Sequence, residues 1–341
     1  MTAQPAQPTQ PTRPGEPARP SGPAGPTTET IALPSTGHLA LIALALCAVS
    51  TAAPLIAATA APALAIAFWR TAMASAVVLP TAVVRNRAEL RSLDRRQRRL
   101  SVISGVFLAA HFATWVPSIT FTTVASSTAL VSTQPVWTAV AARLAGRRVE
   151  RGVWLGIGIA LAGVVWLTGA DLALSARALF GDLLAVAGGI FAAVYITAGA
   201  AVRARISTTT YTAICYTTCS LLLLAGCLFS GVALVGYTGS TWLKLVALTV
   251  GAQLLGHSLF NVVLRSTSPT VVSLAILFEV PGAAVIAALW LGQVPSISTV
   301  PGLLLLLLGI AVVVRYGRSQ PDPDAGTDPD DQPTGGVTAG Q

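Results

Sequence analysis

Apolar stretches long enough to cross a membrane recur along this chain from about His38 to Val314. A hydrocarbon layer about 30 Å thick requires roughly 20 apolar residues for each helical crossing. The composition agrees, because only 10% of the residues are charged, against about 25% in soluble domains. We therefore predict an all-α integral membrane protein surrounded by the lipid bilayer, with no sizeable soluble domain between its helices.

The two ends of the chain differ from the rest. Residues 1–37 are rich in Pro, Thr, Ala and Gln, and residues 319–341 carry several aspartates among Pro and Gly. Such segments bury too little apolar surface to offset the entropy of ordering, so we predict disordered tails. The first apolar stretch begins far from Met1 and no charged region directly precedes it, which favours a retained membrane helix over a cleaved signal peptide.

Gly, Pro and charge clusters divide the apolar core into ten predicted transmembrane helices. Their ranges are 38–58, 62–84, 100–119, 121–144, 152–170, 180–202, 208–229, 241–264, 268–291 and 298–315.

The basic residues support this count. Short cytoplasmic loops collect Lys and Arg, and here the basic residues concentrate in alternate connections. The connections predicted to lie inside carry Arg85, Arg87, Arg91, Arg95, Arg96, Arg98, Arg99, Arg147, Arg148, Arg151, Arg203, Arg205 and Arg265, whereas the outside connections offer only Arg177 and Lys244. We predict a multi-pass protein of the inner (cytoplasmic) membrane with both termini cytoplasmic. The net charge of +8 then reflects how the protein is oriented in the membrane and does not indicate a nucleic-acid partner.

A repeat connects the two halves of the chain. The segment SGVFLAAHFATW, which contains His111, aligns with VGAQLLGHSLFN, which contains His257, at an offset of 146 residues. A repeat of five helices must enter the membrane in the opposite sense the second time, so we predict an inverted repeat of 38–170 and 171–318. Without a gap, the same offset pairs Ser127 with Ser273, Ala129 with Ala275, Pro135 with Pro281, Gly146 with Gly292 and Gly163 with Gly309.

Several of these segments resemble the EamA-type members of the drug/metabolite transporter superfamily. They are AIAFWR, SGVFLAAHFATWVPSI, STALVSTQPVWTAVAARLAGRR, GDLLAVAGGIFAAVYI and SPTVVSLAILFEVPGAAVIAALWLGQVPS. The last resembles the family's glutamate-proline signature, although this chain reads Glu279-Val280-Pro281 and ends the helix with Gln293 in place of an acid. The resemblance implies ten helices, cytoplasmic termini and movement of small organic solutes, mostly outward.

Glu279 and Arg70 are ionisable residues inside predicted helices. Glu279 lies about 12 residues, or roughly 18 Å, from the outer end of its helix, and Arg70 lies about 12 Å deep. An ionisable group at that depth is costly unless it is paired or faces water. Glu279 is a candidate for proton coupling or solute binding, or for a structural link to Arg70. Arg70 is a candidate for binding a carboxylate or phosphate, or only for neutralising Glu279.

Two polar stripes line the symmetry-related third and eighth helices. On the eighth helix, Gln253, His257 and Asn261 recur every four residues. On the third helix, His111 and Trp115 belong to the corresponding stripe. Such stripes face the bundle interior, where they line a cavity or form interhelical hydrogen bonds. Two histidines without converging acids or thiols fall short of a metal-ligand set, so we predict no metal.

Pro135 and Pro281 occupy equivalent positions in the two halves, and each removes a backbone hydrogen bond from its helix. They could act as hinges or as fixed kinks that make room for a cavity. Trp137 lies within a helix and is a further candidate to line the cavity.

Together these features predict a secondary transporter that exports a small metabolite or drug-like solute by alternating access, with proton coupling through Glu279 as a hypothesis. The rival is an integral-membrane enzyme such as a lipid-linked transferase, but its chemistry needs clustered acids or a nucleophile beside a base, and the acids of the core are scattered. We therefore predict no enzyme and no cofactor. The sequence leaves open the solute, the coupling ion and whether two chains pair as a homodimer.

Overall fold

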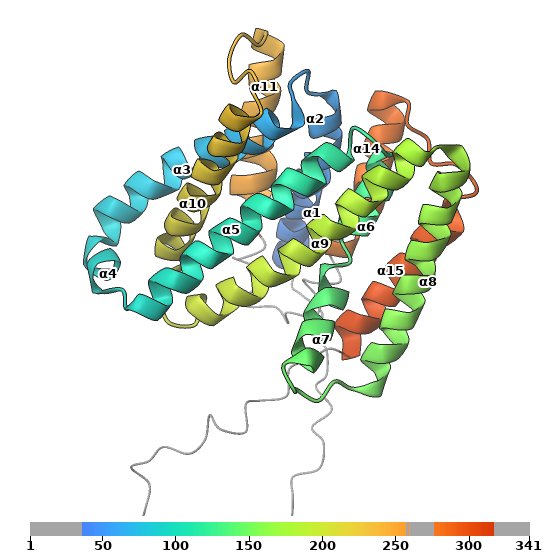
Figure 1. Cartoon of the computed structure of the whole chain (residues 1–341), viewed down its shortest axis with the longest axis horizontal. Helices are drawn as coiled ribbons and strands as arrows, with labels where there is room; N and C mark the ends of the chain where they lie inside the picture. Colours follow the sequence, from blue (N-terminus) through green and yellow to red (C-terminus); the bar gives the residue numbers. More distant parts are fainter. Residues whose placement is uncertain (1–35, 257–258, 260–275, 317–341) are drawn as a thin grey trace, which may run out of the picture. The chain divides into compact units, whose positions relative to one another are not determined.

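A computed structural model of the chain describes residues 36–256, 259 and 276–316, and these residues form helices joined by turns, with no strand among them (Figure 1). The helices are α1 Thr36–Ser50, α2 Ala52–Ala58, α3 Ala63–Arg85, α4 Arg87–Ser92, α5 Arg95–Ser118, α6 Val124–Val131, α7 Gln134–Leu144, α8 Arg151–Leu174, α9 Ala176–Arg203, α10 Thr208–Phe229, α11 Gly239–Ala247, the π-helix η1 Leu248–Gly256, α14 Glu279–Leu291 and α15 Val300–Tyr316.

Six helical segments in the described part of the chain are long and apolar enough to cross a membrane. They are Leu39–Ala58, Ala63–Arg85, Arg95–Ser118, Arg151–Ala170, Ala176–Arg203 and Thr208–Phe229, and Glu279–Leu291 and Val300–Tyr316 are shorter apolar helices. Large apolar side chains on these helices are exposed, for example Phe229 at 92% and Leu289 at 84%. Extended apolar surface of this kind suits contact with lipid.

Polar caps define several helix starts. Thr123, Ser175, Ser207 and Thr238 each accept a hydrogen bond from a backbone N–H in the first turn of α6, α9, α10 and α11. These bonds satisfy donors that a helix start otherwise leaves free. The polar residues between apolar runs therefore fix where the helices begin.

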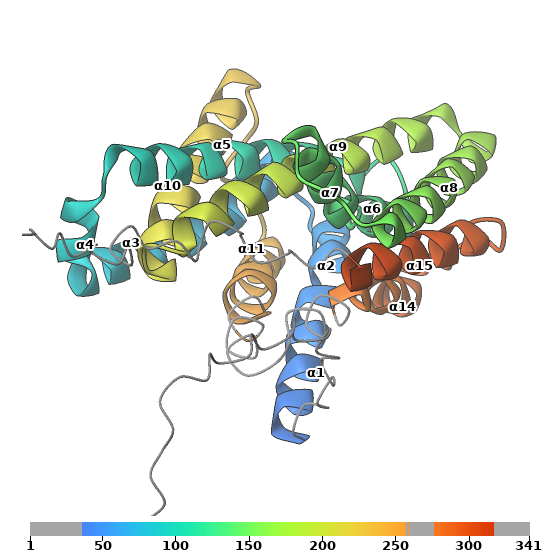
Figure 2. The same ribbon diagram turned by 90° about the horizontal axis from the view of Figure 1, so that it is seen from below.

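The contacts between helices follow the internal repeat. Helix α3 packs on α10 and α8 packs on α15, and each of these pairs joins equivalent members of the two halves. Other contacts come in exchanged pairs. Helix α5 packs on α9 as its counterpart η1 packs on α1, and α6 and α7 pack on α9 as α14 packs on α1 and α2. Figures 1 and 2 show α5 beside α9 and α8 beside α15 from two directions. Every one of these interfaces therefore includes both halves of the chain.

Glycines bring α8 and α15 into close contact. Gly156 and Gly163 on α8 face α15, and Gly302 and Gly309, which lie 146 residues later, face α8. A Cβ at Gly156 would lie 2.7 Å from the backbone nitrogen of Val313, and one at Gly309 would overlap the backbone of the facing helix. Small residues are required where two membrane helices approach to backbone contact.

Helix α4 ties the connection after α3 to the start of α10. The Glu89 carboxylate accepts a hydrogen bond from the Ser207 backbone nitrogen at 2.7 Å, and from the hydroxyl groups of Ser207 and Thr210. Asn86 donates to both Glu89, at 3.3 Å, and Ser207, at 3.1 Å. One carboxylate therefore joins the two halves outside the membrane-spanning helices.

Candidate functional site

Arg70 is buried inside the helix bundle and joins its two halves. It lies on α3 with 3% of its surface exposed, and its Nε donates to Gln253 Oε1 at 2.8 Å. Gln253 is itself buried in η1. A π-helix shifts the side chains that follow it out of the α-helical register and is often found at functional sites. The predicted site residues Arg70 and Gln253 are thus in direct contact.

Aromatic rings of α5 surround the Arg70 guanidinium. Its central carbon lies 4.4 Å from the centre of the Phe112 ring and 5.8 Å from that of Trp115. The faces of aromatic rings attract cations, and this attraction replaces part of the hydration that Arg70 loses on burial.

Three buried polar atoms, two at this centre and one beside α14, lack a hydrogen-bond partner within the described residues. They are Arg70 Nη1, Trp115 Nε1 and Ser50 Oγ. The Ser50 hydroxyl packs against Gly282, which lies one turn after Glu279 on α14. Buried donors normally have a partner, and a donor without one is costly. Arg70 Nη1 and Trp115 Nε1 are therefore free to donate to an acceptor that enters the site.

Glu279 begins α14 and is partly buried. It lies near enough to Arg70 for electrostatic attraction. In the described part of the chain, however, no ion pair within 4.0 Å joins the two groups. Tyr216 of α10 lies beside both Arg70 and Gln253. The site thus contains a cation and an acid with polar side chains around them.

His111 connects this centre to α9. Its Nδ1 forms a hydrogen bond with the Gly188 carbonyl at 2.9 Å, and its ring stacks on Trp115 with the centroids 5.6 Å apart. Trp115 of the predicted stripe therefore lies next to Arg70, and His111 stacks on Trp115. Their predicted counterparts His257 and Asn261 lie outside the described residues.

Trp137 forms a hydrogen bond at the start of its own helix. It is on α7, and its indole nitrogen donates to Thr133 Oγ1 of the preceding turn at 3.0 Å. The rings stacked against the Arg70 guanidinium are those of Phe112 and Trp115. Trp137 thus makes a local contact within its own helix.

Pro135 and Pro281 occupy equivalent places in the two repeats. Pro135 lies in the first turn of α7, after the interruption that separates α7 from α6, and Pro281 lies in the first turn of α14. A proline is tolerated in a first turn, because its missing N–H would have no helical partner there. Gly146 follows α7 with a φ of 82°, and Gly292 follows α14 with a φ of 68°. The repeat therefore extends to where each helix starts and stops.

Phe112, Tyr216 and Ser50 belong to the site but are not among the residues singled out from the sequence. Tyr216 was detectable, because it is a polar residue within a long apolar stretch, as Glu279 is. Phe112 gave no signal, since an aromatic residue in an apolar helix is equally compatible with a place facing lipid.

A helical membrane protein with an internal repeat and a buried cation that contacts both repeats has the architecture of a secondary transporter. The sequence model of the EamA-like transporter family matches residues 35–169 and again residues 179–315. The chain therefore belongs to this family and is a multi-pass membrane protein of the drug/metabolite transporter superfamily.

Other comparisons add the fold but no activity. A comparison with curated proteins gave no match. One solved crystal structure, described only as that of a protein, matches with 22% identity and a TM-score of 0.57, over 83% of this chain and 99% of that chain. At this identity the likeness concerns the fold alone.

Proposed function

We propose that this protein exports a small organic metabolite or drug-like solute across the cytoplasmic membrane by alternating access. The observation that carries the proposal is Arg70, a buried guanidinium whose Nη1 has no hydrogen-bond partner among the described residues, at a site built by both repeats. A purely structural arginine would have all its donors satisfied. A guanidinium fork suits a carboxylate or phosphate on the solute, and Arg70 Nη1 is the group that receives it.

In this proposal ten helices span the membrane, the repeats occupy 38–170 and 171–318, and both termini are cytoplasmic. The fourth predicted helix supports the alternating-access part of the proposal. All eight residues of α6 are buried, whereas in α7 only Val136 is buried. One half of this helix is thus fully enclosed, whereas most of the other half is partly exposed, which supports a transporter that is closed toward one side only. Pro135 and Pro281 then act as hinges.

Glu279 serves as the coupling group. It shares the site with Arg70 without a close ion pair, so its protonation changes the charge available to the solute. Gln253, His111, Trp115, His257, Asn261 and Trp137 are the further candidates to line the path.

An untargeted comparison of growth medium tests the proposal. Cells express the wild-type protein, the Glu279→Gln variant or no protein, at equal membrane abundance. Glu150→Gln is the matched control, because Glu150 is an exposed acid outside the bundle. We expect a solute enriched by the wild type and by the control but not by Glu279→Gln.

The outcomes separate the parts of the proposal. Export by Glu279→Gln that equals the wild type and keeps its pH dependence would remove proton coupling through Glu279. If no solute is enriched by any variant, uptake assays with the same strains decide whether the protein imports; a failure there as well would contradict transport.

A further inference from the structure

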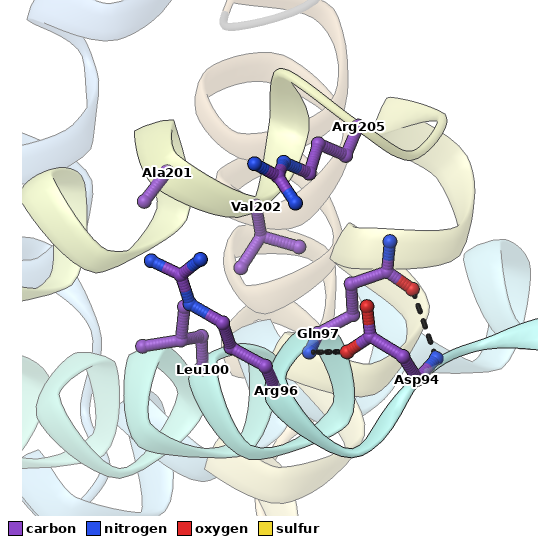
Figure 3. A pocket seen from close by; sticks show the side chains of 7 residues that line it. All are labelled: Asp94, Arg96, Gln97, Leu100, Ala201, Val202 and Arg205. Atoms are coloured by element: carbon purple, nitrogen blue, oxygen red, sulfur yellow. Dashed lines mark hydrogen bonds between the residues drawn. The ribbon is translucent and has the colours of Figure 1, made fainter. Parts of the chain in front are cut away.

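A small pocket lies where α5 and α9 meet at their ends, away from Arg70. It is lined by Asp94, Arg96, Gln97, Leu100, Ala201, Val202 and Arg205 (Figure 3). Its volume is about 70 Å³, whereas pockets for drug-sized ligands measure about 300–1,000 Å³. A cavity needs about 10–15 Å³ of such volume to hold one water molecule, so this pocket has room for a few waters. This pocket is therefore too small for a transported organic solute and large enough for one phosphate group.

The pocket lies at the ends of two helices that are long enough to cross a membrane. Helices α5 and α9 have 24 and 28 residues and are both long enough to span, and the pocket takes its residues from the first turns of α5 and from the end of α9. Leu100, Ala201 and Val202 supply the apolar side chains of the lining, and Asp94, Arg96 and Arg205 supply the charged ones (Figure 3). A ligand here would have its polar part in the pocket and its apolar part toward the lipid.

The two arginines of the pocket are available for a ligand. Arg96 and Arg205 come from different repeats, are both exposed, and donate no hydrogen bond from their side chains to any described residue. Asp94 is the one acid in the lining, and its Oδ1 already accepts from the Gln97 backbone nitrogen at 2.7 Å to cap α5. Two free guanidinium groups against one engaged carboxylate leave the pocket positive, and the first turn of α5 adds the positive end of its dipole.

An apolar surface continues from the pocket along the seam of the two helices. Phe107 on α5 and Phe191 on α9 pack across that seam with ring centres 6.2 Å apart, and both are partly exposed. Phe107 lies seven residues beyond Leu100, which is about 10 Å along the helix. Acyl chains that leave the pocket would therefore meet aromatic side chains.

We propose that this pocket binds the phosphate of an anionic phospholipid, held between Arg96 and Arg205, with the acyl chains along the seam between α5 and α9. Guanidinium groups bind phosphate oxygens in a bidentate manner, and basic pockets between membrane helices are sites at which lipid headgroups are recognised. The bound lipid would bridge the two repeats.

Native mass spectrometry of the purified full chain, titrated with phosphatidylglycerol in detergent, tests the site. The test variant is Arg96→Ala with Arg205→Ala. The matched control is Arg87→Ala with Arg99→Ala, which removes the same charge from exposed arginines that do not line the pocket. We expect the dissociation constant of the tightest-bound lipid to rise about 30-fold in the test variant, from about fivefold for each arginine, and less than about threefold in the control.

Three results would overturn the proposal. Equal losses in both variants would indicate diffuse attraction to a basic surface, and unchanged binding in the test variant would exclude the pocket. Inorganic phosphate that competes as effectively as phosphatidylglycerol would indicate a site for a soluble anion. Thermal unfolding without lipid checks folding, and the test variant should match the wild type because the two guanidinium groups have no partner within the described chain.

Discussion

Replacing Glu89 by glutamine tests how firmly one carboxylate holds the two repeats together. Glu89 accepts hydrogen bonds from the Ser207 backbone nitrogen and from the side chains of Ser207, Thr210 and Asn86. Glutamine keeps the length and one acceptor oxygen, but it loses the charge and presents an NH₂ group to donors. The substitution therefore weakens the contact without creating a cavity.

The size of the effect follows from these bonds. A hydrogen bond to a charged group contributes about 1.5–3 kcal/mol to stability. Glu89 is partly exposed and glutamine retains some of the contacts, so we expect a net loss of about 2 kcal/mol in the free energy of unfolding. For a chain of this size the melting temperature should fall by about 4 °C.

Thermal unfolding in detergent, followed by circular dichroism, measures this change. Glu150→Gln is the control, because Glu150 is exposed and its side chain accepts no hydrogen bond from the described residues. Its melting temperature should stay within about 1 °C of the wild type, as is usual for surface changes.

The dependence on pH gives a second, independent readout. Partial burial alone would raise the pKa of Glu89, but the hydrogen bonds from Ser207, Thr210 and Asn86 outweigh it and hold the pKa below its usual range. The unfolded chain therefore binds the proton more tightly, so the carboxylate contributes its stability at neutral pH and loses it as the pH falls through and below about 4.3. The wild type and Glu89→Gln should converge on acidification. Equal melting temperatures at neutral pH, or a difference that stays constant down to about pH 3, well below the unfolded pKa of about 4.3, would refute the reasoning.

Three further changes probe other parts of the molecule. Gly309→Val should prevent folding or sharply lower membrane abundance, because its Cβ would overlap the α8 backbone, whereas Gly158→Val, with open space around it, should leave abundance unchanged. Asp94→Ala should lower stability by about 1 kcal/mol through loss of the α5 cap, seen as faster hydrogen exchange in its first turn, and Asp94→Asn should recover most of it. Arg70→Lys should reduce export at least tenfold at equal abundance, since lysine keeps the charge but not the fork; export at wild-type rate would mean that the fork is unnecessary.

The family and the repeat were predictable from the sequence, because they depend on signals that are local or periodic. Apolar length marks a membrane helix, and a constant offset of 146 residues marks the repeat. The structure extends that offset to Gly156 and Gly302, which share the interface of α8 and α15. The breaks within the predicted helices at 38–58 and 121–144 were harder to foresee, since helices in lipid tolerate proline and polar residues when neighbouring helices satisfy the freed backbone groups.

By itself the sequence predicted that Arg70 and Glu279 lie in apolar helices and that the stripes containing Gln253 and Trp115 face inward, and both of these side chains are buried. Only the tertiary structure decided that Arg70 Nε pairs with Gln253, 183 residues away, that Phe112 and Trp115 surround it, and that Glu89 reaches Ser207. The physical reason is that helical periodicity specifies which face of a helix is buried, whereas the partner of that face depends on how the two repeats pack against each other.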